Sequence, residues 1–294
     1  MTSPTRRGQL VHDSVAVSVV IPAHNAGELL AVQLSALAHQ DYDGRLEIVV
    51  VDNNSTDGSV DHLEISDSGQ AVRIVRAHDG VGPAYARNRG ADAAHGELLL
   101  FCDADDRVHP DWVRKMVDFL HDGRYDIVTS AVEGRTLNPA GHRKIAEIAS
   151  PENFQSSKFF APIVVGCSFG CTAAAYRDLG GIDETYRANE EVEFGWRAVR
   201  SGYRVGYLPE ALVAYRYRVG FRAGFHQGMS RGTSFARLAD AFPGSGLPAQ
   251  SATRLCRELL GLAVARATPE ERGLLTGIAL GRLRGAITHR TLRL

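Results

Sequence analysis

The sequence predicts an α/β protein with a mostly parallel sheet flanked by helices. Two observations support this fold class. Between residues 15 and 132, short β-branched apolar runs alternate with longer stretches of helical periodicity. Clusters rich in Asp and Asn follow directly after several of the apolar runs. Functional groups of open parallel sheets gather in such positions, outside the carboxyl ends of the strands.

The expected strands and helices alternate along the first half of the chain. Strands are expected at residues 17–21, 46–51, 72–75, 98–101 and 127–128. Helical spacing occupies residues 27–39, 59–65, 82–94 and 110–121. In the last of these, Pro110 near the first turn and Asp111 beside it suit the positive end of a helix. Four consecutive strand–helix repeats predict parallel pairing.

The regular alternation ends beyond Val132, where a turn at residues 138–141 and two prolines, Pro151 and Pro162, interrupt long elements. Later elements are expected as a helix at 190–200, strands at 203–208 and 212–216, and amphipathic helices at 253–267 and 270–287. We therefore expect four segments, namely a polar leader at 1–14, an α/β half at 15–132, a second half at 133–241 and a helical extension at 242–294.

Composition excludes several classes of protein. The chain has 294 residues, 44% hydrophobic and 23% charged, which excludes a disordered chain. Its net charge of −1 offers no general attraction for nucleic acid. No apolar run approaches the ~20 residues that cross a bilayer, and residues 1–16 lack the apolar core of a secretory signal. Four irregularly spaced cysteines fit no disulfide framework, so we expect a cytoplasmic protein in which Cys167 and Cys171 are packing residues.

The strongest local signal is Asp103-Ala104-Asp105-Asp106, which follows a buried apolar run. Three carboxylates in four residues repel one another unless a cation or solvent relieves them. Mg²⁺ or Mn²⁺ holding a diphosphate would use such carboxylates. A solvated acidic turn that caps the next helix is the alternative.

Three further polar motifs each have a functional and a structural interpretation. Residues 52–57 follow the second strand and suit base or ribose recognition, or simply an Asx turn. Arg87, on a helix after a Gly-rich entry, suits a phosphate clamp or an ion pair. Glu190 and Glu191 begin a helix, where acids either complement the helix dipole or supply a general base.

Taken together, these motifs resemble family 2 glycosyltransferases of the GT-A fold. The matching segments, in family order, are residues 17–25, 48–57, 86–90, 96–106, 180–184 and 190–197. They cover roughly residues 15–217, and their shared order is far more specific than any one motif. The resemblance implies a nucleotide-sugar-binding half at 15–132 and an acceptor-binding half with the catalytic base at 133–241.

The resemblance also implies an inverting, single-displacement transfer of a hexosyl or deoxyhexosyl group from a nucleotide-diphosphate sugar, with Mg²⁺ or Mn²⁺. The family's Asp-x-Asp motif falls on Asp103, Ala104 and Asp105. Asp105 is the implied metal ligand, and Asp103 is implied to lie against the ribose or to share the ion. The family's acidic pair falls on Glu190 and Glu191, and Glu191 is the expected base.

The implied nucleotide pocket is lined by residues at the ends of the first two strands and on the following helix, which are Pro22, Asn25, Asp52, Asn54, Arg87 and Asn88. The chain departs from the family pattern at His24, where Tyr is usual, at Asn53, where a second Asp is usual, and at Glu191, where Asp is common. Residues 214–217 stand where a metal-binding His is often found, and His226 is an alternative ligand. Trp196 is expected either to stack on a sugar or to fill the core.

The C-terminal region from Ser251 carries eight arginines and three glutamates, a local net charge of +5. Together with neighbouring leucines, this charge suits docking on an anionic membrane surface, where lipid-linked acceptors occur. Packing on the catalytic core or in a homodimer is the alternative.

The sequence therefore predicts a metal-dependent inverting glycosyltransferase, cytoplasmic or at the inner face of the membrane. Its partners would be the donor and a carbohydrate, lipid-linked or small-molecule acceptor, with no nucleic acid. A nucleotidyltransferase and a non-catalytic nucleotide-sugar-binding module are the alternatives. The absence of a Gly-rich, Lys-bearing triphosphate loop argues against the first, and the presence of Asp103, Asp105 and Glu191 argues against the second.

Overall fold

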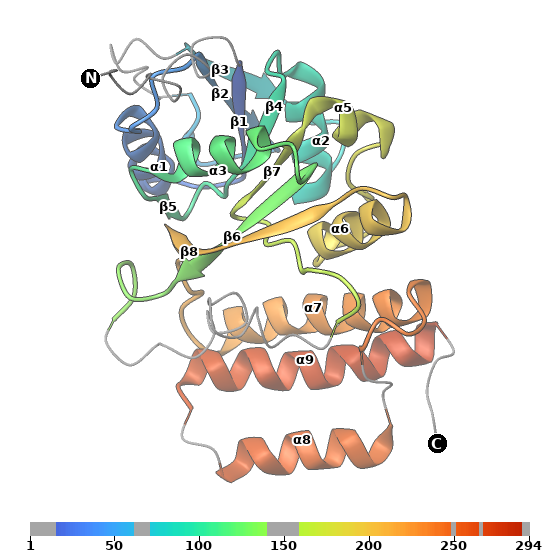
Figure 1. Ribbon diagram of the computed structural model, residues 1–294. Coiled ribbons are helices and arrows are strands. Elements are labelled where there is room, and N and C mark those ends of the chain that lie inside the picture. The colour runs from blue at the N-terminus through green and yellow to red at the C-terminus, as the bar shows by residue number, and fades with distance from the viewer. Residues whose placement is uncertain (1–15, 62–70, 140–158, 248–250, 265–266, 290–294) are drawn as a thin grey trace, which may run out of the picture.

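The protein is described by a computed structural model, which covers residues 16–61, 71–139, 159–247, 251–264 and 267–289. In these residues a single eight-stranded sheet carries helices on both faces, and a group of long helices lies at its lower side in Figure 1. The strands are β1 (Val17–Ala23), β2 (Leu46–Asp52), β3 (Ala71–Arg76), β4 (Leu98–Phe101), β5 (Arg107–Val108), β6 (Ile127–Glu133), β7 (Phe169–Thr172) and β8 (Val205–Ala214). The helices are α1 (Glu28–Ala38), α2 (Pro83–Ala93), α3 (Trp112–His121), α5 (Ala173–Asp178), α6 (Glu190–Arg200), α7 (Phe221–Ala241), α8 (Ala252–Val264) and α9 (Pro269–Thr288).

The strand order is β3-β2-β1-β4-β7-β6-β8-β5. The first four strands in this order pair in parallel, as do β6 and β8, whereas β7 and β5 run antiparallel to their neighbours. The predicted mostly parallel sheet is thus confirmed. Because β1, β2 and β4 are parallel, the polar clusters that follow them meet at one edge of the sheet.

The central strands are apolar in succession because helices cover both faces of the sheet. Val19 and Ile21 pack in a core with α1 and α3, whereas Val20, between them, packs in a second core with α2 and α6. All three side chains are fully buried. Successive residues of a strand point to opposite faces, so a continuous apolar run fills both layers.

Strand β7, in the middle of the sheet, is absent from the sequence prediction. It has only four residues and contains Gly170, which weakens a strand signal. The structure explains this glycine, because a Cβ there would collide with the side chain of Leu100 on β4. Phe169 stacks on Phe101 of the same neighbouring strand, with ring centroids 4.4 Å apart.

Two strands predicted at 203–208 and 212–216 are instead one strand, β8. Its pairing with β6 jumps from Leu208 to Ala211, leaving Pro209 and Glu210 exposed in a bulge. Proline has no N–H for the ladder, so the strand bulges and continues beyond it. The helix predicted at 59–65 begins as a turn through Asp61, and its remaining residues lie outside the described chain.

Both predicted C-terminal helices are present, as α8 and α9, and α7 precedes them as a further long helix. Helices α7 and α9 run side by side (Figure 1). Glycines line their contact. A Cβ at Gly224, Gly228 or Gly232 would collide with carbonyl oxygens of α9. The two backbones therefore touch, in the way that small residues at every fourth position allow.

Candidate functional site

The ends of β1 and β2 are joined by hydrogen bonds between their loops. Asn25 has a positive φ of 49°, and its Oδ1 accepts a hydrogen bond of 2.7 Å from the Thr56 backbone N–H. The Asn25 N–H donates to Ser55 Oγ at 3.1 Å. The Nδ1 atom of His24 lies 2.8 Å from the Asn53 carbonyl oxygen. Pro22, half-buried in β1, pairs with Val51, so the predicted pocket residues share one rim.

Asp52 is the last residue of β2 and is fully buried. Its carboxylate accepts hydrogen bonds from the Ser55 N–H at 3.1 Å and from Arg76 at 2.7 Å, and it lies 3.2 Å from His78 Nε2. Burial alone would favour the protonated acid, but these partners lower the pKa of Asp52 to about 2. The group is a fixed negative charge that organises the loop.

Asn53 stands where the resembling family often has Asp, and the structure gives a reason for the amide. Its Nδ2 donates to the carbonyls of Ala77 and Gly80, at 2.6 and 2.8 Å, and its Oδ1 accepts from the Gly82 N–H at 2.8 Å. An ionised carboxylate has no hydrogen to donate. Asn54, with φ of 62°, donates to the same Gly80 carbonyl at 2.9 Å.

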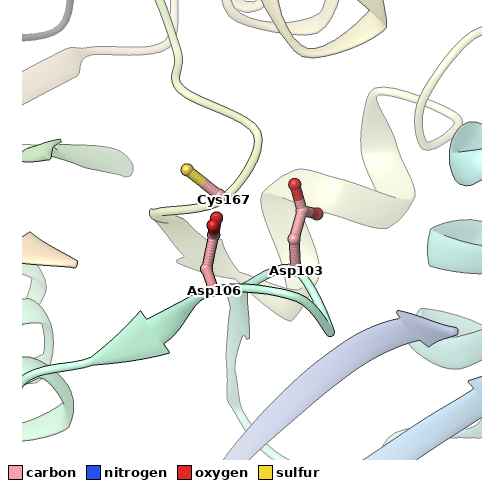
Figure 2. Close-up of side chains that lie close together, drawn as sticks. All are labelled: Asp103, Asp106 and Cys167. Atoms are coloured by element: carbon pink, nitrogen blue, oxygen red, sulfur yellow. The ribbon is translucent and has the colours of Figure 1, made fainter. Parts of the chain in front are cut away.

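The acidic loop after β4 holds its carboxylates in different surroundings (Figure 2). Asp106 is buried, and its Oδ1 accepts a 2.7 Å hydrogen bond from the Arg216 N–H just beyond β8. Asp103 is half-buried and hydrogen-bonds Arg87, whereas Ala104 between them is buried in the core. In Figure 2 the carboxyls of Asp106 and Asp103 extend in the same direction from the acidic loop, and the Cys167 side chain lies close to that of Asp106.

Asp105 lies against a basic loop that the sequence prediction did not include. Its Oδ2 is 3.3 Å from Arg218, and its backbone carbonyl accepts a 2.9 Å hydrogen bond from Arg216 Nε. Burial and the neighbouring Asp103 raise the pKa of the Asp105 carboxyl. The sequence analysis singled out residues 214–217, which include Arg216, as the place of the family's frequent His, and Arg218 follows them directly.

The acidic loop fits a divalent cation. Among the described residues, one carboxylate oxygen each of Asp103 and Asp106 and the sulfur of Cys167 lie within 4.8 Å of one another. The buried Oδ2 atom of Asp106 has no hydrogen-bond partner among the residues that the structure describes. Burial together with Asp103 and Asp105 raises the pKa of this carboxyl. A cation relieves such repulsion. Mg²⁺ and Mn²⁺ prefer the carboxylate oxygens, and burial keeps the Cys167 thiol protonated by raising its pKa.

Arg87 connects the acidic loop to the helix that bears the expected base. It is 3% exposed, and its guanidinium bonds Asp103 Oδ1 at 2.7 Å and Glu190 Oε1 at 2.8 Å. Burial opposes the charge of Arg87, but the two carboxylates raise its pKa. Sequence spacing could not show whether the α6 N-terminus faces the acidic loop, and this bridge establishes that it does.

Glu191 is the half-buried second acid of α6. Removal of its carboxyl from water, together with the neighbouring Glu190, raises its pKa to about 8, although Arg87 and Arg231 act in the opposite direction. The carboxyl lies under the loop at Gly166, where an added Cβ would be 3.3 Å from Glu191 Cδ. A carboxylate with a pKa in this range is suited to accept a proton near neutral pH.

Other candidate residues lie outside this cluster. Asn88 donates to the Ile182 carbonyl at 2.9 Å and to Glu184 at 2.8 Å, and it accepts from Tyr176 at 2.7 Å, so it fastens α2 to the loop before α6. Trp196 is 1% exposed and packs against Phe159, Phe160 and Phe242, which makes it a core residue and not a sugar platform. His226 is exposed on α7 and does not belong to the cation group of the described chain.

Comparison with known proteins finds glycosyltransferases that are similar to this chain. The chain is 29% identical over 246 residues to the pre-mycofactocin glycosyltransferase of Mycobacterium tuberculosis, covering 79% of this chain and 49% of that protein. It is 32% identical over 229 residues to the amylovoran biosynthesis glycosyltransferase AmsB of Erwinia amylovora, covering 68% and 69%. The chain thus spans about half the length of the first relative.

A solved mannosyltransferase, PcManGT from Pyrobaculum calidifontis in complex with GDP-Man and Mn²⁺, matches the fold with a TM-score of 0.61 at 20% identity. The match covers 94% of this chain and 72% of that one. The fold is therefore of the GT-A glycosyltransferase type. The family described as Glycosyl transferase family 2 matches residues 18–180, and the chain belongs to this family.

Proposed function

We propose that the protein transfers a sugar from a nucleotide-diphosphate sugar to an acceptor hydroxyl, with inversion at the anomeric carbon. The bridge from Arg87 to both Asp103 and Glu190 is the observation that carries this proposal. It brings the expected donor-binding loop and the base-bearing helix together in one site. In-line displacement requires the donor and the base to lie next to the same acceptor hydroxyl.

Within this proposal, Glu191 accepts the proton of the acceptor hydroxyl as that oxygen attacks the anomeric carbon. Arg87 hydrogen-bonds both Asp103 and Glu190 and so fixes their relative positions. The base and the donor would thereby be aligned before reaction. Asp52, Pro22, Asn25 and Asn54 would line the nucleotide pocket, with Arg87 and Asn88 close behind. Asp103 and Asp105 would hold Mg²⁺ or Mn²⁺, which would supply positive charge for the departing diphosphate. Asp105 lies outside the group of Asp103, Asp106 and Cys167, so its carboxylate would exchange Arg218 for the ion.

The acceptor is proposed to be a carbohydrate, a lipid-linked molecule or another small hydroxyl compound. Within the described part of the chain, no helix is long and apolar enough to cross a bilayer. Arg257 and Leu260 are nevertheless exposed on α8, as is Ile287 on α9. These residues suit peripheral contact with an anionic membrane that carries a lipid-linked acceptor.

The replacement Glu191→Gln tests the proposed function. The amide keeps the shape of the side chain but accepts no proton, so we expect transfer to fall at least ~100-fold while donor binding persists. Donor binding is measured by thermal shift with a panel of nucleotide sugars and Mn²⁺, and transfer is measured by product analysis.

Glu193→Gln is the matched control, since Glu193 lies on the same helix but pairs with Arg197 at 2.8 Å. It should keep its transfer activity. Undiminished transfer by Glu191→Gln would exclude this base. Release of pyrophosphate from a nucleoside triphosphate would instead indicate a nucleotidyltransferase.

A further inference from the structure

Arg231, on α7, is a charged group beside the site that the proposed reaction does not use. Its guanidinium carries five N–H donors. Within the described chain it makes one side-chain hydrogen bond, of 3.4 Å, from Nη2 to the Tyr215 hydroxyl. The described carboxylates include no salt-bridge partner for it. Glu191, Tyr215 and Cys167 are close enough to interact with it electrostatically.

The backbone at Arg231 is tied to the turn that begins α6. Its carbonyl oxygen accepts a 3.1 Å hydrogen bond from the Asn189 side chain. Asn189 has a positive φ of 55° and directly precedes Glu190 and Glu191. The part of α7 that carries Arg231 is therefore attached to the base-bearing turn itself.

The contact with α9 fixes α7 along its own axis. Gly228 and Gly232 flank Arg231, and a Cβ at either would collide with α9 backbone, at Leu274 and Ile278. Gly277 and Gly281 meet α7 in the same way from the other side. Backbones packed this closely leave little room for sliding. The C-terminal helices thus hold Arg231 at one place relative to α6.

The charges that face Glu191 come from three elements, which are Glu190 on α6 itself, Arg87 on α2 and Arg231 on α7. Arg87 already bonds two carboxylates, Asp103 and Glu190. Its positive charge is therefore largely matched. Arg87 and Arg231 both lower the pKa of Glu191, and Arg87 does so more strongly. Arg231 differs from Arg87 because it forms no salt bridge with a described carboxylate, so no ion pair competes for its charge.

We propose that Arg231 is a positioning residue of the transfer site, which favours the ionised form of the Glu191 carboxylate and is held in place by the α7–α9 pair. The inference rests on the proposed role of Glu191 as base. It gives the C-terminal helices a part in catalysis, because α7 carries the positively charged Arg231 and α9 holds α7 in place. It also explains why α7 and α9 pack backbone to backbone beside that residue.

The pH profile of kcat/KM for Arg231→Gln tests this proposal. Loss of the cation should move the acidic limb of this profile about one pH unit higher. The value of kcat/KM should then fall ~10-fold at neutral pH and change little at pH values above the limb. Arg231→Lys keeps the positive charge, so its acidic limb should lie close to that of the parent protein. Arg237→Gln is the control on the same helix, because Arg237 pairs with Asp183 and stacks on Tyr186 instead.

A purely structural role would lower kcat/KM equally at every pH, and that result would overturn the proposal. An unchanged limb in Arg231→Gln would overturn it as well. A second readout needs no transfer at all, namely the titration of Glu191 Cδ by carbon NMR in donor-free protein, assigned with Glu191→Gln.

In Arg231→Gln this resonance should titrate at higher pH than in the parent protein. If Glu191 titrates at the same pH in folded Arg231→Gln as in the parent protein, the inference is overturned, even if the protein transfers sugar. A moved titration in a protein that transfers no sugar would support the relation between Arg231 and Glu191 and contradict the proposed function.

Discussion

Single residues at this site balance excess negative charge against few cations. Asp103, Glu190 and Glu191 act on the guanidinium of Arg87, which bonds the first two, whereas Asp105 lies against Arg218. Burial and neighbouring carboxylates raise the pKa of Asp105, Asp106 and Glu191.

We expect Mn²⁺ to stabilise the protein through Asp105. A cation that binds only the folded state adds about 2.7 kcal/mol at 100 times its Kd. Asp105→Asn should lose this gain, which a thermal-shift titration measures. Asp92→Asn removes an exposed carboxylate that pairs with Arg89, and it should keep the gain. A full Mn²⁺ response in Asp105→Asn would contradict the assignment of Asp105 as a ligand.

Burial of Glu191 should also cost stability at high pH. Its folded-state pKa of about 8 lies above the ordinary value of 4.5, so the folded protein keeps a proton that the unfolded chain has released between these values. Stability therefore falls as pH rises through this window, and the cost is complete above it. Glu191→Gln should raise the urea midpoint, and more so at about pH 8.5 than at about pH 5.5.

Glu28→Gln is the control for that measurement, because Glu28 is exposed in the first turn of α1. Its urea midpoint should change little at either pH. Equal midpoints for Glu191→Gln and the parent protein at high pH would mean that the charge of Glu191 is well solvated.

At the scale of elements, local signals determined some parts of the fold and long-range packing determined others. The helix at 190–200 was predicted with the bounds it has, because its apolar spacing and acidic first turn are local features. The proline bulge in β8 and the short strand β7 were not predicted. Both depend on neighbouring strands, which supply the pairing and the aromatic contact that a short segment lacks.

The helix pair α7 and α9 offers a test at this scale. Gly277→Ala places a methyl group against the Phe225 carbonyl, so we expect a loss of about 1–3 kcal/mol in the free energy of unfolding. Gly261→Ala is the matched control, because a Cβ there meets no atom of the described residues within 4 Å. That variant should be neutral or gain up to about 1 kcal/mol from better helix propensity. Urea unfolding compares the two, and equal stability would contradict close backbone packing.

Over the whole molecule, the near-zero net charge conceals an uneven distribution. The excess of arginine in the C-terminal region is partly used inside the fold, because Arg254 and Arg282 both bond Glu258 and so join α8 to α9. Packing on the rest of the protein, one of the alternatives for this region, is seen for α9, which contacts α7. Arg257 and Arg284 remain exposed, near apolar side chains such as Leu260 and Ile287.

We expect the protein to float with vesicles that contain anionic lipid at low salt, and to be released as salt screens the contact. Leu260→Asp combined with Arg257→Glu should remove this binding without changing the transfer site. Neutral vesicles serve as the comparison. Full retention in the aqueous fraction would contradict membrane contact, and a concentration-dependent dimer would identify a second copy as the partner of this face.

The sequence by itself determined the α/β class, the four leading parallel strands and the polar clusters at their ends, because hydrophobic periodicity and loop chemistry are local. Tertiary structure alone decided that Glu190 meets Asp103 through Arg87, and that Trp196 lies in the core. It also decided that the Arg231 carbonyl accepts a hydrogen bond from Asn189, and that the glycines on either side of Arg231 contact α9. These contacts join residues far apart in the chain, so they depend on how sheet and helices pack together, and no local pattern encodes that geometry.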